Sequence, residues 1–257
     1  MKTFLQPLQN LAEMEEIRKE AGKNRGVIAV SGCMESQKAH FIYGLSGLFP
    51  CHLILAEDER SAKQIYEDYR FYKKNVYYYP ARDLLFFQAD IHGNLIIRQR
   101  MQVIKAMLTE EEITVVTSID GCMDFLGPLD AIKNQLLRFR NDSVMDMDKL
   151  KEDLVKMGYE RVGQVEMPGQ FSIRGGIVDV YCLTEENPWR IELWGDEIDS
   201  IRSFDAQSQR SLENLDEIVI YPAAEQQAEK SGLTFLDYFP FERTMVFLDE
   251  PNRLVEN

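Results

Sequence analysis

Residues 26–56 read GVIAVSGCMESQKAHFIYGLSGLFPCHLILA. A short apolar run at residues 26–30 ends at Ser31 and Gly32, a helical pattern follows over residues 36–45, and a second apolar run covers residues 52–56. Short strands that alternate with helices in this way form βαβ units, whose strands are parallel. The stretch therefore predicts an α/β domain built on a mainly parallel sheet.

The same alternation continues on both sides of this stretch. Helical patterns cover residues 11–20, 60–72 and 94–108, and strand-like runs cover residues 76–79 and 113–117. Further along the chain, the apolar run MVFL at residues 245–248 leads into Asp249 and Glu250. We expect this run to return to the parallel sheet as an additional strand.

The pattern changes after Gly127 and Pro128. Residues 136–140 alternate with a period of two, residues 147–157 form one helical pattern, and several strands with tight turns follow from residue 170. Strand-like residues 189–194 and 197–204 flank Gly195 and Asp196, which predicts a hairpin, and residues 218–221 form the last strand. We therefore predict an antiparallel α+β domain over residues 127–221, inserted between residues 1–126 and 222–257 of the α/β domain.

Composition and charge limit the possible functions. The net charge of −14 disfavours tight binding to nucleic acid, including a single-stranded DNA groove, and favours a protein partner with a complementary surface. No apolar run approaches the ~18 residues of a membrane span, and residues 1–10 lack a signal-peptide pattern, so we expect a cytoplasmic protein without membrane contact. Four scattered cysteines and three histidines predict no disulfide, metal site or catalytic constellation.

A degenerate phosphate loop follows the first apolar run. Residues 32–39 read GCMESQKA, against the working pattern G-x-x-x-x-G-K-[ST]. Gly32 and Lys38 match, but Gln37 replaces the second glycine that the phosphate cradle needs, and Ala39 cannot ligate Mg²⁺ as a hydroxyl would. Residues 32–39 therefore predict no bound nucleotide or other cofactor. The two matches are either the remnant of a RecA-like, P-loop-type domain or a coincidence of a turn glycine with a surface lysine.

The strand that ends in Asp249 and Glu250 is consistent with the first of these alternatives. In P-loop ATPases a strand of this kind carries a magnesium-linked acid and a glutamate that orients water. Acidic residues also commonly end a buried strand simply because the chain there returns to solvent. Without an intact phosphate loop, we assign no catalytic residue to this chain.

Two longer stretches carry a specific resemblance. Residues 158–181 read GYERVGQVEMPGQFSIRGGIVDVY, and residues 189–205 read WRIELWGDEIDSIRSFD, followed by Ser208, Gln209 and Arg210. They resemble the second domain that UvrB shares with the transcription-repair coupling factors, with the pattern G-x-F/Y-x-x-R-G-x-x-x-D-x-F/Y and then R-x-E-F/W-F/W-G/D-D-E-I-D-x-I/L-R. Tyr79 and Pro80, the following helix with Arg98 and Arg100, and residues 114–127 resemble the first domain of the same families.

Three features favour the coupling factors over UvrB. The phosphate loop is degenerate, residues 80–98 are too few for the long aromatic hairpin with which UvrB clamps DNA, and the S-Q-R triplet at residues 208–210 is similar to the coupling-factor sequence. The resemblance implies a module that binds UvrA as UvrB does, and that recruits it to stalled RNA polymerase in transcription-coupled nucleotide excision repair.

The resemblance also implies a division of labour. Polymerase binding, DNA binding and ATP- and Mg²⁺-dependent translocation would belong to other domains of the parent protein, whose C-terminal domain can contact this module. The alternative is a UvrB-type DNA-dependent ATPase fragment. ATP with Mg²⁺ would raise the melting temperature of such a fragment, because a ligand that binds only the folded state stabilises it.

By resemblance, Arg161 and Arg174 are the residues expected to bind UvrA, with Phe171 as an apolar anchor beside them. Arginine suits this role because its planar fork holds a carboxylate with two hydrogen bonds. Where UvrB has a further arginine, this chain has Ser172. The alternatives are an ion pair of Arg174 with Glu192 or Asp179, a solvated Arg161, and core positions for Phe171 and Tyr181.

Overall fold

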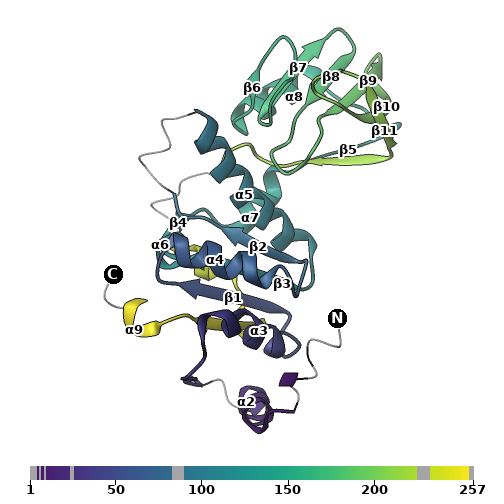
Figure 1. Ribbon diagram of the computed structural model, residues 1–257. Coiled ribbons are helices and arrows are strands. Elements are labelled where there is room, and N and C mark those ends of the chain that lie inside the picture. The colour runs from purple at the N-terminus through teal and green to yellow at the C-terminus, as the bar shows by residue number, and fades with distance from the viewer. Residues whose placement is uncertain are drawn as a thin grey trace. The chain divides into compact units, whose positions relative to one another are not determined.

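The computed structural model describes residues 5, 7, 8, 10–23, 26–82, 90–224 and 232–254, with the backbone alone for residues 90–94. The chain forms two compact units (Figure 1). Unit 1 consists of Met1–Arg82, Thr109–Asp124 and Thr234–Asn257, and unit 2 consists of Asp83–Leu108 and Phe125–Leu233. Each unit is a mixture of helices and strands.

Unit 1 is built on a parallel sheet of four strands. The sheet order is β14-β1-β3-β2, with every pair of neighbours parallel, from β1 (Cys51–Ala56), β2 (Val76–Tyr79), β3 (Ile113–Ser118) and β14 (Thr244–Leu248). The helices are α2 (Ala12–Lys23), α3 (Glu35–Leu45), α4 (Glu59–Tyr69), α6 (Ile119–Met123) and α9 (Pro251–Leu254), with 3-10 turns η1 (Phe235–Tyr238) and η2 (Phe241–Arg243). The predicted parallel sheet and its returning strand are confirmed.

Burial on both faces explains the continuous apolar runs of this sheet. All six residues of β1 and of β3 are buried, as is typical of parallel strands covered on both sides. On one face α3 and α4 pack through a shared cluster: Ala39, Ile42, Ile54, Ala56, Ala62, Ile65, Tyr69, Val76 and Val116. On the other face, the ring of Tyr79 stacks on Phe235 of η1 with centroids 3.6 Å apart.

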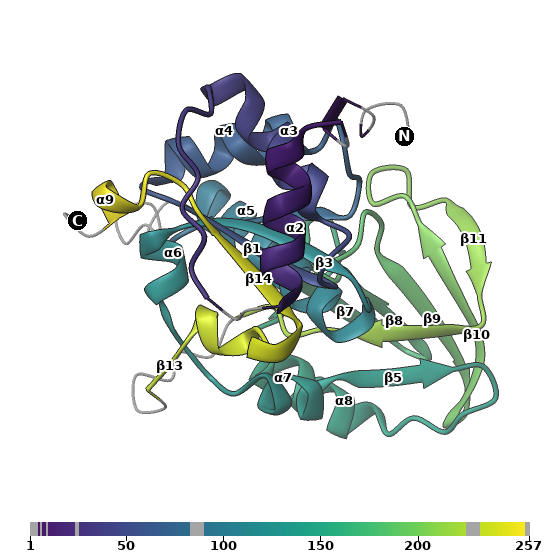
Figure 2. The ribbon, with the colours of Figure 1, turned by 90° about the horizontal axis from the view of Figure 1, so that it is seen from below.

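The helix α2 covers the part of unit 1 that contains β14 (Figure 2). Met14 of α2 and Leu45 of α3 belong to a second apolar cluster, against which Met245 and Phe247 of β14 pack. The strand β14, near the end of the described chain, therefore packs against α2, α3 and β1, which all lie near its beginning.

Residues 26–30 do not form the predicted buried strand. This segment has no strand conformation, and Val27, Ile28 and Val30 are 97%, 39% and 47% exposed. The strand β1 already pairs with β14 on one side and β3 on the other, so no place beside β1 is open to this segment. Its apolar, β-branched residues supply strand propensity, but a strand forms only where it finds a partner.

Unit 2 is built on a sheet of six strands. The sheet order is β11-β10-β9-β8-β7-β6, from β6 (Glu160–Arg161), β7 (Gln170–Arg174), β8 (Ile177–Val180), β9 (Trp189–Trp194), β10 (Glu197–Phe204) and β11 (Ser211–Leu215). Neighbours are antiparallel, as predicted, except that the short β6 runs parallel to β7. The predicted hairpin is confirmed, because β9 and β10 join through Gly195 and Asp196 with Glu197 paired to Trp194.

Shorter elements complete unit 2. The helices are α5 (Asp90–Thr109), α7 (Leu129–Gln135) and α8 (Met147–Lys156), and the remaining strands form two pairs: β5 (Leu137–Arg140) with β12 (Glu217–Ile220), and β4 (Phe125–Leu126) with β13 (Leu233–Thr234). Asp146 caps α8, since its side chain accepts hydrogen bonds from the backbone N–H of Asp148 and Lys149 at 3.0 Å each. None of the described helices is long and apolar enough to cross a membrane.

Candidate protein-binding face

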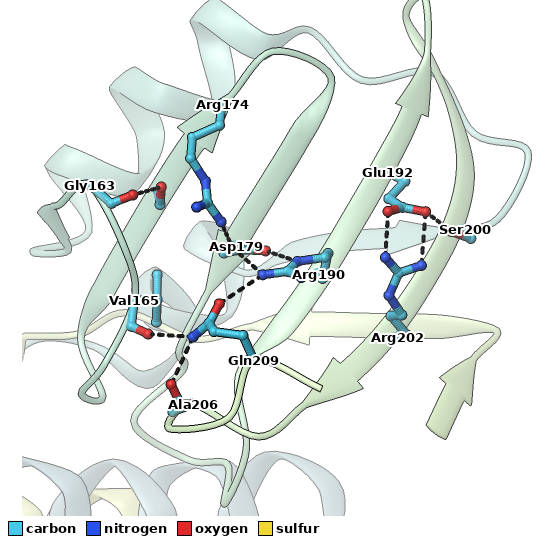
Figure 3. Close-up of polar contacts among 11 residues, drawn as sticks. Gly163, Val165, Arg174, Asp179, Arg190, Glu192, Ser200, Arg202, Ala206 and Gln209 are labelled. Carbon is cyan, nitrogen blue, oxygen red and sulfur yellow. Dashed lines mark hydrogen bonds and ion pairs between the residues drawn. The ribbon is translucent and has the colours of Figure 1, made fainter. Parts of the chain in front are cut away.

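One face of the six-stranded sheet carries charged side chains from four neighbouring strands (Figure 3). Asp179 of β8 lies opposite Ser172 of β7 and Arg190 of β9, and Arg190 lies opposite Arg202 of β10. Side chains alternate between the two faces of a strand, so these residues share one face while their apolar neighbours share the other. We call this surface the polar face.

Asp179 is the centre of the polar face. Its side chain is 1% exposed and accepts three hydrogen bonds: from Arg190 Nε at 2.7 Å, from Arg190 Nη2 at 2.9 Å and from Arg174 Nη2 at 2.7 Å. Hydrogen bonding to Asp179 raises the pKa of Arg190 above its ordinary value. Two arginines on one carboxylate leave this part of the polar face with a positive charge.

A second ion pair lies beside this cluster. Arg202 donates two hydrogen bonds to Glu192, one of them at 2.8 Å, and Ser200 Oγ donates a third at 3.2 Å. Hydrogen bonding from Arg202 lowers the pKa of Glu192. Of the two partners expected for Arg174, the structure therefore selects Asp179, and Glu192 belongs to Arg202.

The degenerate phosphate loop, residues 32–39, lies in unit 1 and leads into α3. Gly32 adopts φ +83°, and α3 begins at Glu35. Gln37, in place of the second glycine, accepts a hydrogen bond from the backbone N–H of Met34 at 3.4 Å and so occupies a donor at the helix N-terminus. Ala39, in place of the magnesium-binding hydroxyl, is 4% exposed within the apolar cluster of α3 and α4.

Lys38 is held by three carboxylates of the same chain. Its Nζ lies 2.6 Å from Glu35 Oε1, 2.7 Å from Asp249 Oδ1 and 3.1 Å from Glu250 Oε1. Partial burial alone would lower the pKa of Lys38, but hydrogen bonds to these carboxylates outweigh it and raise the pKa. One lysine among three carboxylates is a net negative site, which repels a polyphosphate. The structure thus brings Lys38 of the loop together with Asp249 and Glu250, the two acidic residues that follow β14.

Within the described part of the chain, no group of three or more His, Cys, Asp or Glu side chains could hold a metal ion. The four cysteines are free thiols, three of them buried. Burial raises the pKa of Cys122 to about 11, which leaves its thiol protonated and unreactive. Among the described residues, the polar face and the Lys38 cluster each gather several charged side chains in direct contact.

Comparison with known proteins finds a family that is similar to part of unit 2. Residues 137–225 match the family model of the UvrB interaction domain. We name this part of the chain the UvrB interaction domain, after the family model that it matches. It extends from β5 through β12 and therefore contains the whole polar face.

The chain is also similar to transcription-repair-coupling factors of several bacteria. It is 40% identical over 152 residues to the protein of Bacillus subtilis (strain 168), and 33% identical over 152 residues to that of Staphylococcus aureus (strain MRSA252). It is 33% identical over 150 residues to that of Staphylococcus haemolyticus (strain JCSC1435). These matches cover 58–59% of this chain but only 13% of each relative.

The two arginines expected to bind a partner are accessible in the UvrB interaction domain. Arg161 lies on β6, the edge strand, and is exposed, and no hydrogen bond or ion pair is recorded for its side chain among the described residues. The side chain of Arg174 is 47% exposed, because its bond to Asp179 uses only one side of the guanidinium group. Both therefore have donors available to a partner.

Phe171 does not belong to the accessible surface. Its side chain is 0% exposed, because it lies on the buried face of β7, while Ser172 and Arg174 occupy the alternate positions. The expectation that Phe171 is an apolar anchor for a partner is therefore wrong for this conformation, and Phe171 is a core residue. Tyr181 is half-buried, and its hydroxyl donates to the backbone oxygen of Glu186 at 2.5 Å.

Sequence patterns missed two contributors to the polar face, Arg190 and Gln209. Arg190 alternates with apolar residues in WRIELW, and this alternation is a signal that it shares a face with Glu192. Gln209 has no comparable signal, because it lies in a loop and reaches the face through tertiary structure alone. Ser172, which stands where UvrB has arginine, is 1% exposed and donates to Gly163 O at 3.0 Å.

Proposed function

We propose that this chain is the UvrA-binding module of a transcription-repair-coupling factor, and that it recruits UvrA to stalled RNA polymerase in transcription-coupled nucleotide excision repair. One observation carries the proposal: the UvrB interaction domain presents Arg161 and a half-exposed Arg174 on a strongly acidic chain. The similarity to transcription-repair-coupling factors supports the pathway.

The chemistry of the polar face suits an acidic protein surface. A guanidinium group has five N–H donors in a fixed fork, and Arg174 spends one nitrogen on Asp179. Its remaining edge can bind a carboxylate of a partner with two hydrogen bonds. Arginines of this kind commonly dominate the binding energy of protein interfaces.

The module is proposed to be one part of a larger machine. The aligned region is 13% of the length of its relatives, so polymerase binding, DNA binding and ATP-driven translocation are assigned to other domains of the parent protein. A contact between this module and the C-terminal domain of the parent belongs to the same proposal.

We infer that unit 1 is a RecA-like domain without nucleotide chemistry, and that the α+β domain at residues 127–221 is inserted into it. The parallel sheet and the return of the chain to it in β14 support this arrangement. The Gln37 cap, the buried Ala39 and the carboxylates around Lys38 support a loss of nucleotide binding and of ATPase activity.

The rival is a UvrB-type DNA-dependent ATPase fragment. It requires a phosphate loop that accepts a polyphosphate and a hydroxyl that ligates Mg²⁺. Lys38, the group that would bind the phosphates, is already paired with Asp249 and Glu250. The proposed module therefore explains more of the observed geometry than the rival does.

The test is a calorimetric titration of this chain with UvrA. We expect saturable binding, and an affinity at least ~30-fold weaker for the Arg161→Ala/Arg174→Ala double variant, since central arginines often contribute 1–2 kcal/mol or more each. The matched control is Arg138→Ala/Arg140→Ala, two exposed arginines on β5 of the same domain. No binding by the unmodified chain would remove the proposed function, and equal losses in both double variants would remove the named surface.

A further inference from the structure

The side chain of Gln209 joins three parts of the UvrB interaction domain that are separate in sequence. Its Oε1 accepts a hydrogen bond from Arg190 Nη2 at 3.0 Å, and its Nε2 donates to Val165 O at 3.4 Å and to Ala206 O at 2.7 Å (Figure 3). Gln209 thus connects the sheet, through Arg190, to the loop of residues 162–169 that follows Arg161.

A tight loop holds Gln209 in place. Asp205 N donates to Arg210 O at 2.9 Å, and Gln209 N donates to Asp205 O at 2.8 Å. Gln209 itself adopts φ +58°, a conformation that residues other than glycine adopt rarely. Such a conformation persists where the surrounding structure enforces it, and here both ends of the side-chain amide are bonded.

Arg190 transmits this connection to Arg174. The guanidinium group of Arg190 is fixed on three sides: by Asp179 through two hydrogen bonds, by Gln209 through a third, and by the ring of Phe204, whose centroid lies 4.4 Å from Cζ. The same Asp179 oxygen that accepts from Arg190 Nη2 also accepts from Arg174 Nη2. Arg190 and Arg174 thus share one acceptor oxygen of the buried Asp179.

The loop next to Arg161 is tied to the same network. Val165 O bonds to Gln209, and Gly163 O accepts from Ser172 of β7. The backbone N–H of Val162, the residue after Arg161, donates a hydrogen bond to Phe171 O at 2.9 Å. A single set of contacts therefore holds both the strand that carries Arg174 and the loop that begins beside Arg161.

We propose that Gln209 and Arg190 are positioning residues of the UvrA-binding surface, which hold Arg174 and the loop after Arg161 in the geometry that the partner recognises. The proposal rests on the proposed function and adds to it residues that do not themselves contact UvrA. It also gives the S-Q-R triplet at residues 208–210 a physical role, because Gln209 holds its own loop and the loop of residues 162–169 against the sheet by hydrogen bonds.

The first test is a double-mutant cycle measured by titration with UvrA. Gln209→Asn keeps an amide and a residue type that tolerates positive φ, but it shortens the side chain by one methylene group, so it cannot reach both partners. We expect a five- to tenfold weaker affinity for UvrA. In the Arg174→Ala background the same substitution should change affinity less than twofold, because the group that it positions is gone.

The matched control is Gln207→Asn, an exposed glutamine of the same loop, which should leave affinity unchanged. A loss that persists undiminished in the Arg174→Ala background would overturn positioning and indicate direct contact or general disruption. Unfolding by urea, measured for each variant, separates a loss of fold from a loss of geometry.

The second test uses the free chain and does not depend on UvrA. In ¹⁵N NMR spectra, a guanidinium group that is held by hydrogen bonds rotates slowly about its C–N bonds, and separate signals are expected for Arg174 and Arg190. Gln209→Asn should average these signals, and Gln207→Asn should not. Unchanged signals would overturn the positioning role even if UvrA binds. If Gln209→Asn averages the guanidinium signals but the chain does not bind UvrA, only the proposed function is ruled out.

Discussion

Asp179 is a buried carboxylate that lies beneath the polar face and binds two arginines. It is 1% exposed and neutralises Arg190, whose side chain is 14% exposed. A buried charge that loses its partner costs more than the pair contributes when intact. Asp179→Ala would leave Arg190 without a counter-ion beneath the surface.

We therefore expect Asp179→Ala to lower the free energy of unfolding by ~3 kcal/mol, in the range for broken buried pairs. Asp179→Asn keeps one acceptor oxygen in place and should cost clearly less. Urea denaturation of both variants measures the difference. Equal stability of the two variants would show that the acceptor oxygen retained in asparagine contributes nothing, since both variants lack the charge of Asp179.

Because His52 is buried, we expect the stability of unit 1 to depend on pH. Its side chain is 0% exposed, and neither ring nitrogen has a hydrogen-bond partner among the described residues. Burial, with a smaller effect of the charge on Lys73, lowers the pKa of His52 from 6.5 to about 4. The folded state therefore binds the proton less readily than the unfolded state.

The lowered pKa of His52 does not change the free energy of unfolding above pH 6.5, because His52 is neutral there in both the folded and the unfolded state. Below pH 6.5 the unfolded state takes up the proton first, so stability falls until about pH 4, where the folded state is protonated as well. We expect this group to remove ~3 kcal/mol across that window. The loss should disappear in His52→Leu and persist in His40→Gln, as measured by urea denaturation from pH 4 to pH 7.5.

At the scale of one element, the helix α8 depends on its N-cap. The carboxylate of Asp146 accepts from two backbone N–H groups that would otherwise lack partners. Asp146→Ala should therefore destabilise unit 2 by ~1 kcal/mol. Asp146→Asn, which caps almost as well, should stay within a few tenths of a kcal/mol of the unmodified chain. Chemical denaturation followed by circular dichroism compares the two, and equal losses would contradict a capping role.

Apolar periodicity predicted most strands and helices because burial imposes the pattern directly. The strands β1 and β3 are buried on both faces and have continuous apolar runs, whereas β9 and β10 are buried on one face and alternate. Residues 26–30 have the same apolar character, yet β14 takes the place beside β1. A local sequence pattern indicates a preference for a strand. Tertiary structure decides whether residues 26–30 or β14 pairs with β1.

The candidate site was predictable only in part for a related reason. The exposed arginines Arg161 and Arg174 lie within recognisable motifs, but the assignment of carboxylates to arginines depends on strand register. A register shift between Ile198 and Ser200 of β10 sets which side chain lies opposite Glu192. No short-range pattern contains that information, so Asp179 and Glu192 were equal candidates for Arg174. Phe171 was misassigned because the motif does not show which face of β7 is buried.

For the whole molecule, the Lys38 cluster predicts the response to nucleotide. Glu35, Asp249 and Glu250 already surround the only cation of the degenerate loop, and the net charge of the chain is −14. We expect ATP with Mg²⁺, at millimolar concentration, to leave the melting temperature unchanged. Differential scanning fluorimetry measures this, with ATP in the absence of Mg²⁺ as the control. A magnesium-dependent rise in the melting temperature would favour the hypothesis of a UvrB-type ATPase fragment.

The tie between Lys38 and Asp249 has a consequence for the conditions under which the chain can work. A nucleotide that braces a domain is lost when it is hydrolysed or when its pool runs low, and the domain then loosens. The brace between α3 and the end of β14 is part of the polypeptide, at 2.7 Å, and cannot dissociate into solution. This contact between α3 and the end of β14 therefore does not depend on the supply of any ligand.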